Sequence, residues 1–90
     1  MKTLMLLMAE YGTAQIPLAK CAPLFGLTPA EAAKRAIRAA LPVPAFRLAS
    51  QKSPWIIDAP ALAAYVDRQR EAAELEWKKI QSASASSAHL

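Results

Sequence analysis

The sequence predicts a mostly α-helical fold with a small β-hairpin, arranged as a winged helix-turn-helix. Two short helical segments flank the glycine at position 26, which is the order of a helix-turn-helix. Two short β-like segments, separated by a polar loop, follow directly and would form the wing. A long helical segment then completes the chain, and no internal repeat interrupts this order.

Length and composition bound the fold further. Ninety residues suit one small domain, and a chain this short buries only ~60% of its unfolded surface, so its core must be modest. Alanine supplies much of the apolar content, which favours short and closely packed helices. We expect residues 1–80 to form the domain and the low-complexity residues 81–90 to be a disordered tail.

The start of the chain and its cysteine content indicate the compartment. The single cysteine, Cys21, allows no intrachain disulfide and favours a reducing environment. The opening apolar run is far shorter than the ~20 residues that span a membrane, and Glu10 follows it without a convincing cleavage site. We therefore expect a cytoplasmic protein without membrane contact.

The first two helices are predicted from apolar spacing and from their ends. Apolar residues recur at helical spacing over about residues 3–10, and residues 15–17 follow as a brief extended piece. Pro17 then suits the first position of the second helix, whose apolar face carries Cys21. Gly26 is the expected C-terminal cap of that helix.

The third helix, "LTPAEAAKRAIRAAL", has the clearest start signal in the chain. Thr28 is its N-cap, Pro29 fits the first helical position, and Glu31 completes a capping box. Helical spacing predicts an inner face of Ala33, Ala36, Ile37 and Ala40. The same spacing predicts an outer face of Glu31, Lys34, Arg35 and Arg38.

The wing and the last helix follow. Pro42 and Pro44 end the third helix, and residues 45–49 and 55–58 are predicted strands joined by the loop of residues 50–54. Trp55 would pack this wing against the body of the domain. Asp58 is the expected cap of the long last helix, whose inner face begins with Leu62, Tyr65, Val66 and Gln69.

The positive charge of the chain is concentrated in one segment. The formal net charge is +4, and the whole excess lies between residues 28 and 52, where Glu31 is the one anion. The five cations of this segment are Lys34, Arg35, Arg38, Arg47 and Lys52. A localised basic stripe is typical of a nucleic-acid surface, because each neutralised phosphate releases counterions. A basic face that serves solubility alone is the alternative.

Six sequence blocks carry a resemblance to a known family. In order along residues 4–72 they are LLMAEYG, IPLAKC, FGLTPAEAAKRA, LPVPAFRL, SQKSPWIID and LAAYVDRQR. As a set they resemble the pyocin activator PrtN family, which is similar to small winged helix-turn-helix proteins of the excisionase and MerR-like kind. Its members look like phage-derived transcription activators, or like recombination directionality factors that act beside a tyrosine integrase on mobile elements. The excisionase pattern usually has a glycine shortly before the Leu-Pro pair, where this chain has Ala39 and Ala40.

The resemblance and the charge pattern together give the candidate DNA contacts. The resemblance implies contacts from the second helix of the helix-turn-helix at Thr28, Lys34, Arg35 and Arg38, and from the wing at Ser50, Gln51 and Lys52. Arg47 adds charge on the adjoining strand and joins this set. Arginine pairs bidentately with guanine in the major groove, and lysine suits phosphate. The alternative for the helix is a solvated face with an ion pair between Glu31 and Arg35.

The last helix carries a second candidate surface. Ala73, Trp77 and Ile80 form an apolar strip at i, i+4 and i+7, beyond the part that a small winged core would cover. Such a strip favours self-association or contact with an integrase, and head-to-tail addition of subunits would coat the DNA as a filament. An exposed Trp77 on a fraying helix end is the alternative.

An enzyme is not expected. The one histidine, His89, lies next to the C-terminus, and no cluster has metal-ligand spacing or the residues that activate a nucleophile. We expect no metal and no cofactor. The predicted function is sequence-specific binding to double-stranded DNA, with cooperative occupancy of repeated sites. It would serve excision with a tyrosine integrase or transcription with RNA polymerase. The competing class is a protein-interaction adaptor that uses the last helix and does not bind DNA.

Overall fold

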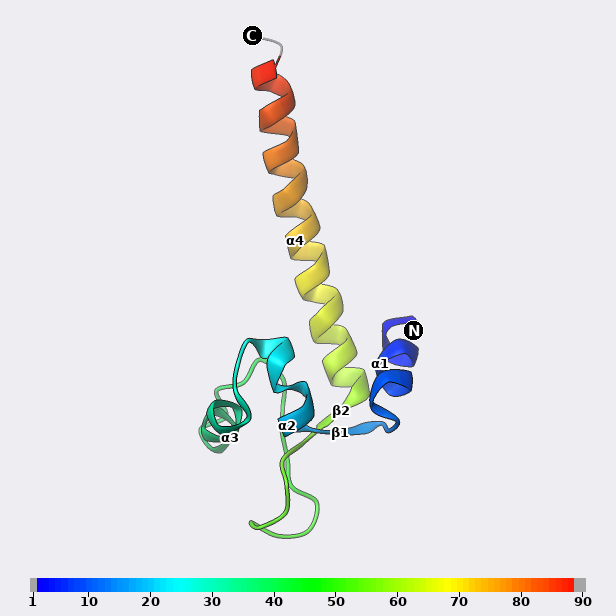
Figure 1. Cartoon of the computed structure of the whole chain (residues 1–90), viewed down its shortest axis with the longest axis vertical. Helices are drawn as coiled ribbons and strands as arrows, with labels where there is room; N and C mark the ends of the chain where they lie inside the picture. Colours follow the sequence, from blue (N-terminus) through cyan, green and yellow to red (C-terminus); the bar gives the residue numbers. More distant parts are fainter. Residues whose placement is uncertain (1, 89–90) are drawn as a thin grey trace.

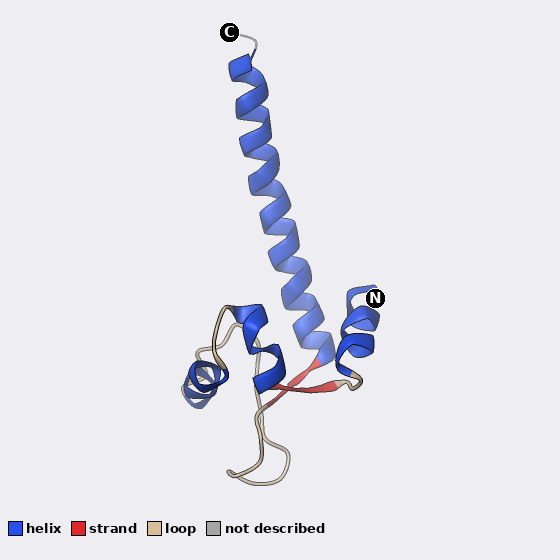
Figure 2. Ribbon diagram, in the orientation of Figure 1, coloured by secondary structure: helices blue, strands red, loops and turns tan. Residues whose placement is uncertain are grey.

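The computed structural model describes residues 2–88 and confirms the predicted fold class (Figure 1). The chain is mostly helical with one small antiparallel strand pair, an arrangement compatible with a winged helix-turn-helix (Figure 2). The elements in order are α1 (Lys2–Tyr11), β1 (Gln15–Pro17), α2 (Leu18–Cys21), the 3₁₀ helix η1 (Ala22–Phe25), α3 (Pro29–Ile37), β2 (Ile56–Asp58) and α4 (Ala59–Ala88).

The core is small and rich in alanine. Its buried side chains come from β1, α2, η1, α3, β2 and the start of α4: Ile16, Leu18, Cys21, Ala22, Ala32, Ala36, Val43, Ile57, Ala59 and Leu62. Ala32 on α3 and Ala22 on η1 lie inside this cluster, and their short side chains let the two helices approach closely. The predicted role of alanine in close helix packing is confirmed.

The strand pair joins segments that are far apart in the sequence. β1 pairs with β2 in antiparallel register, with Ile16 opposite Ile57, and both side chains are fully buried. The predicted partner of β2 was the segment 45–49 instead. That segment contributes a single bridge, in which Phe46 and Ile56 exchange backbone hydrogen bonds of 2.8 and 3.0 Å. β2 pairs with β1 along one edge, which places two isoleucines in the core, and its other edge carries only the bridge to Phe46.

The wing is therefore mainly a loop rather than a two-stranded hairpin. In Figure 2 it is drawn as loop below the strand pair, and the bridge between Phe46 and Ile56 closes its base. Asp58, the expected cap of the last helix, ends β2 and immediately precedes α4. The backbone N–H of Ala59 donates a hydrogen bond of 2.8 Å to the carbonyl of Ala14, which fixes the start of α4 beside β1.

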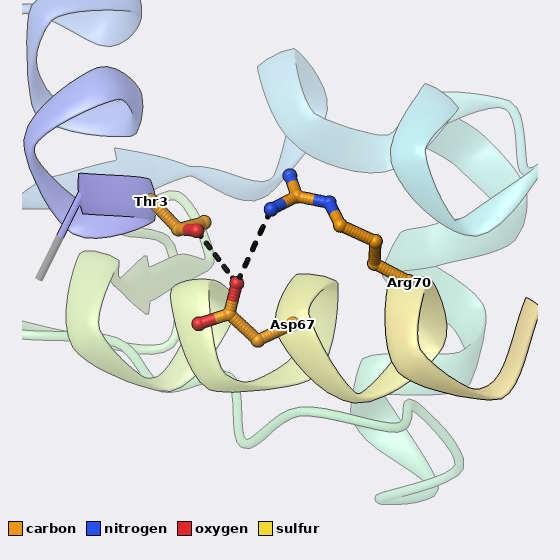
Figure 3. A network of polar contacts seen from close by, with 3 residues as sticks. All are labelled: Thr3, Asp67 and Arg70. Atoms are coloured by element: carbon orange, nitrogen blue, oxygen red, sulfur yellow. Dashed lines mark hydrogen bonds and ion pairs between the residues drawn. The ribbon is translucent and has the colours of Figure 1, made fainter. Parts of the chain in front are cut away.

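Helix α1 packs beside the first part of α4. Leu4, Leu7 and Tyr11 pack against the core cluster. At the N-terminal end of α1, the hydroxyl of the buried Thr3 donates a hydrogen bond of 2.6 Å to the carboxylate of Asp67 (Figure 3). Arg70 lies 3.7 Å from the same oxygen of Asp67. This network marks the level at which α4 leaves the domain.

Beyond that level α4 projects alone. The molecule measures 63 × 27 × 16 Å, and the long dimension follows α4 (Figure 1). Every side chain from Arg68 to Ala83 is exposed. We expected a disordered tail from residue 81, but α4 continues through residues 81–88. Alanine and serine can extend an existing helix because no new nucleation step is needed. His89 and Leu90 lie outside the described residues. Within residues 2–88, no helix is both long enough and apolar enough to cross a membrane.

Candidate nucleic-acid interface

The first helix of the helix-turn-helix is split into two short pieces. α2 changes to the 3₁₀ helix η1 at Ala22, next to Pro23, which has no backbone N–H to continue α-helical hydrogen bonding. Gly26 ends η1 in the left-handed conformation, with φ of 72° and its N–H bonded to Pro23, so its predicted capping role is confirmed. Pro17 lies at the N-cap of α2, one position before the helical position expected for it.

The start of α3 is fixed by the predicted capping box. The N–H of Thr28 donates to Oε1 of Glu31 at 3.1 Å, and the N–H of Glu31 donates to Oγ1 of Thr28 at 3.2 Å. Hydrogen bonding of the Glu31 carboxylate to Thr28 holds the pKa of Glu31 below the ordinary value of 4.5. The bond from the Thr28 backbone has the larger effect, and the Thr28 side chain has the next largest. Glu31 is thereby engaged in the cap, and the ion pair between Glu31 and Arg35 that the alternative interpretation required is not formed within the described residues.

The buried face of α3 differs from the predicted one. Ala32 and Ala36 are buried, whereas Ala33 is half-buried and Ile37 is 68% exposed. Ala40, also assigned to the inner face, lies beyond the helix and is exposed. The reason is that α2 and η1 cover the side of α3 that carries Ala32, so the contact stripe is rotated by about one residue position.

The three cations of the reader helix all reach solvent. Lys34 and Arg35 lie in the last turn of α3, and Arg38 is its C-cap residue just past the helix. All three side chains are exposed. Among the described residues, no carboxylate lies within 4.0 Å of their charged groups, since the one ion pair found joins Asp67 and Arg70. The outer face of α3 therefore carries a net positive charge, with three cations that form no ion pair within the described residues and one exposed carboxylate, that of Glu31.

Helix α3 ends earlier than predicted, and it ends by a specific turn. The N–H of Ala40 donates to the carbonyl of Arg35 at 2.8 Å, and the N–H of Ala39 donates to that of Ala36 at 3.1 Å. This double pattern is a Schellman motif, and its left-handed residue is Ala39, with φ of 53°. Ala39 thus has a backbone conformation that favours glycine. It lies two residues before Leu41 and Pro42, close to where the excisionase pattern has a glycine.

The wing presents a polar tip. Ser50 and Ser53 close a tight turn, in which the N–H of Ser53 donates to the carbonyl of Ser50 at 3.0 Å. The Ser50 hydroxyl oxygen accepts the N–H of Lys52 at 3.2 Å. Gln51 and Lys52 are exposed at the tip. Of the predicted wing contacts, Ser50 shapes the turn, while Gln51 and Lys52 are free to meet a ligand.

Arg47 lies at the base of the wing. Its guanidinium carbon is 4.2 Å from the centroid of the Trp55 ring, a cation–π contact. The Arg47 Nε and the Trp55 Nε1 are both buried without a hydrogen-bond partner. The Trp55 side chain is half-buried against the core. The backbone carbonyl of Trp55 accepts a hydrogen bond of 2.9 Å from the N–H of Leu18. The predicted packing role of Trp55 is confirmed, and Arg47 stands apart from the exposed cations of α3.

The apolar strip of α4 is exposed along its whole length. Trp77 is 60% exposed and Ile80 is 58% exposed, and Ala73 is exposed one turn before them. At 100° per residue, the strip continues the line of Leu62 and Val66, which pack in the core lower on the same helix.

Two exposed apolar residues near the basic surface were missed by sequence reasoning. Ile37 lies on α3, and Leu48 lies in the wing with 69% of its side chain exposed. Ile37 is exposed because α3 ends at this residue, so no further helical turn lies beside its side chain. The sequence did not predict this early end because alanine, present at positions 39 and 40, favours helix.

A comparison with protein-family models identifies the chain's relatives. The model described as pyocin activator protein PrtN matches residues 3–73, from α1 into α4. The chain belongs to this family. The predicted resemblance is confirmed, and regulation of transcription is the broad functional class that membership supports. Comparisons with curated proteins and with solved structures find no match. The family match ends at Ala73, so Trp77 and Ile80 lie beyond it.

Proposed function

We propose that this PrtN-family chain is a sequence-specific DNA-binding regulator of transcription. Helix α3 would enter the major groove, and the wing would lie along the adjacent backbone. The observation that carries the proposal is a set of three exposed cations at one end of α3, Lys34, Arg35 and Arg38, which form no ion pair with any residue that the structure describes. Membership in a family named for an activator supports the same function class.

The shape of the domain suits this docking. Helix α3 lies at one edge of the molecule and the wing loop leaves the opposite end from the projecting half of α4 (Figure 1). The exposed side of α3 begins with a small side chain at Ala30, which helps the helix to fit a groove about 12 Å wide. The projecting helix stays clear of the duplex in this arrangement.

Salt dependence tests the DNA contact. Four exposed cations are available for phosphate: Lys34, Arg35, Arg38 and Lys52. If they all contact phosphate, log K should fall against log salt with a slope of about −3 to −4. The measurement is fluorescence anisotropy with a duplex selected by the protein from a randomised pool. Absence of binding at low salt would remove the proposal and leave the protein-interaction adaptor.

A single arginine tests the assigned reader helix. Arg38→Ala should weaken binding to the selected duplex by roughly 5- to 150-fold, because a bidentate contact to guanine is worth ~1–3 kcal/mol. Arg68→Ala, which removes an exposed arginine from α4, is the matched control and should leave affinity nearly unchanged. Equal effects of the two substitutions would contradict the placement of α3 in the groove.

Cooperative binding through α4 is the finer part of the proposal. The strip of Ala73, Trp77 and Ile80 has no cover within the described part of the chain. It belongs to the half of α4 that extends away from the wing (Figure 1). Contact between neighbouring subunits would bury it and favour occupancy of repeated sites. Trp77→Ala with Ile80→Ala should lower the Hill coefficient on a two-site duplex. Leu75→Ala, equally exposed on the opposite side of α4, should not.

Excision of a mobile element is a second candidate function. The observation that favours it is the same strip, because it would offer a tyrosine integrase bound to nearby DNA an apolar contact at the far end of α4. An excision assay with purified integrase separates the two candidates. Promoter activation without any stimulation of excision would eliminate the recombination factor.

A further inference from the structure

Ile37 is the one large apolar side chain that α3 exposes. It is 68% exposed at the last residue of the helix, and no described residue covers it. Lys34 lies one turn before it on the same line of the helix, and Arg38 follows it directly. Both of these neighbours are exposed and cationic. An apolar group therefore lies at the edge of the positive surface, beside Lys34 and Arg38.

The surrounding charge decides what can cover this isoleucine. An apolar protein surface would have to desolvate the cations beside Ile37 without compensation, which is costly. Duplex DNA offers the opposite combination, since phosphates line the groove and one apolar group projects from its floor. That group is the 5-methyl of thymine, which apolar side chains contact in the major groove.

We propose that Ile37 is a specificity-determining residue that contacts a thymine methyl group in the major groove. This inference rests on the proposed DNA-binding function and adds a base preference to it. The cations of α3 would hold the backbone and read guanine, and Ile37 would select a T·A pair at a neighbouring position. Ala30, exposed two turns before Ile37, leaves room along the helix for the groove floor to approach.

Removal of the single methyl group tests the inference. Wild-type protein first selects a motif from a randomised duplex pool. Each thymine in that motif is then replaced in turn by deoxyuridine, which lacks only the methyl group. At one position we expect the wild type to lose about fourfold in affinity, as for one buried methyl group. Ile37→Ala should show no loss at that position, because the side chain that contacts the methyl group is absent.

A matched variant controls for loss of apolar surface elsewhere. Met5 on α1 is 70% exposed, slightly more than Ile37 at 68%, and α1 lies away from α3 (Figure 1). Met5→Ala should keep the wild-type response to deoxyuridine. Circular dichroism of Ile37→Ala should match the wild type, because the substituted side chain is exposed and alanine favours helix.

The outcomes distinguish this inference from the proposed function. If the wild type selects no motif and binds no duplex, the DNA-binding function itself fails. If it selects a motif but deoxyuridine has no effect at any position, Ile37 reads no methyl group and the inference alone fails. An equal deoxyuridine effect in the wild type and in Ile37→Ala would assign the methyl contact to another residue and also overturn it.

Discussion

Two residues with the same backbone conformation end the two helices of the helix-turn-helix. Gly26 has φ of 72° and Ala39 has φ of 53°, and each closes a Schellman turn. The left-handed conformation costs a non-glycine residue roughly 1–2 kcal/mol, because its Cβ approaches the following carbonyl oxygen. The chain avoids this cost at the turn between η1 and α3 and accepts it at the end of the reader helix.

Reciprocal substitutions measure that cost. Ala39→Gly should raise the free energy of unfolding by roughly 0.5–1 kcal/mol, after the larger unfolded-state entropy of glycine is subtracted. Gly26→Ala should lower it by about 1 kcal/mol, through the backbone alone, because a Cβ there would meet no atom within 4 Å. Urea unfolding measures both. Ala40→Gly, at a residue without positive φ, is the control and should destabilise the protein slightly. Stabilisation by Ala40→Gly equal to that by Ala39→Gly would contradict the explanation.

The capping box of α3 makes stability depend on pH. Hydrogen bonds from Thr28 to the ionised Glu31 lower its folded-state pKa below the ordinary 4.5. A group with a lowered folded pKa contributes stability above its unfolded pKa and loses it as the pH falls through the folded value. The contribution of Glu31 should thus be complete above about pH 5 and decline at more acidic pH.

Substitution of Glu31 by glutamine isolates this effect. Glu31→Gln keeps an oxygen that can accept the Thr28 N–H, but it cannot ionise. The difference in unfolding free energy between the wild type and this variant should be constant from about pH 5 to 7. Below about pH 4.5 the wild type should lose stability relative to the variant, because only the wild type has a carboxylate that becomes protonated. Urea titrations across this range test it. A difference that is flat down to pH 3 would mean that the carboxylate gains nothing from the cap.

At the scale of elements, α4 has two halves with different physical roles. The first half supplies Ala59, Leu62 and Ala63 to the buried interior, and Asp67 accepts the hydrogen bond of Thr3 that anchors α1 (Figure 3). The second half supplies no buried side chain through Ala83. Its helical state therefore depends on propagation from the first half, and its apolar strip adds nothing to the stability of the single chain.

Deletion of residues 74–90 tests this division. The free energy of unfolding and the urea m-value should change little, because m follows the surface exposed on unfolding and this segment buries almost none. Leu62→Ala, at a fully buried position of the same helix, should cost about 2–5 kcal/mol. A loss of similar size on deletion would show that the projecting half packs against the domain.

At the scale of the whole molecule, the strand pair closes the domain. β1 follows α1 and β2 precedes α4, so their pairing holds the helix-turn-helix and the wing between two fixed strands. Cys21 is fully buried under this closure, and burial raises the pKa of its thiol above the ordinary 9.0. A buried thiol with a raised pKa reacts poorly in the folded state.

Labelling of Cys21 should therefore report opening of the domain. At pH 8 a thiol reagent should modify Cys21 only in molecules that have opened, so the rate should rise with urea in parallel with the unfolded fraction. Ala72→Cys in a Cys21→Ser background places a thiol on the exposed half of α4 and should react at once. Immediate reaction of Cys21 in native buffer would show that the strands do not close the core.

The sequence predicted the local features because their causes lie within a few residues. The capping box of Thr28 and Glu31 and the Gly26 turn depend on hydrogen bonds between near neighbours. The concentration of charge between residues 28 and 52 is likewise a property of the sequence alone. Family membership also follows from the order of residue blocks, and the family match confirms it.

Tertiary structure decided which of these local segments meet. The partner of β2, the rotation of α3 that exposes Ile37, and the stacking of Arg47 on Trp55 all depend on contacts between distant segments. Pairing of β1 with β2 buries Ile16 against Ile57, whereas the predicted hairpin partner of β2 keeps only the bridge at Phe46. The left-handed Ala39 arises in the same way, since the chain must turn at that point to bring Val43 into the core, whatever the local preference of alanine.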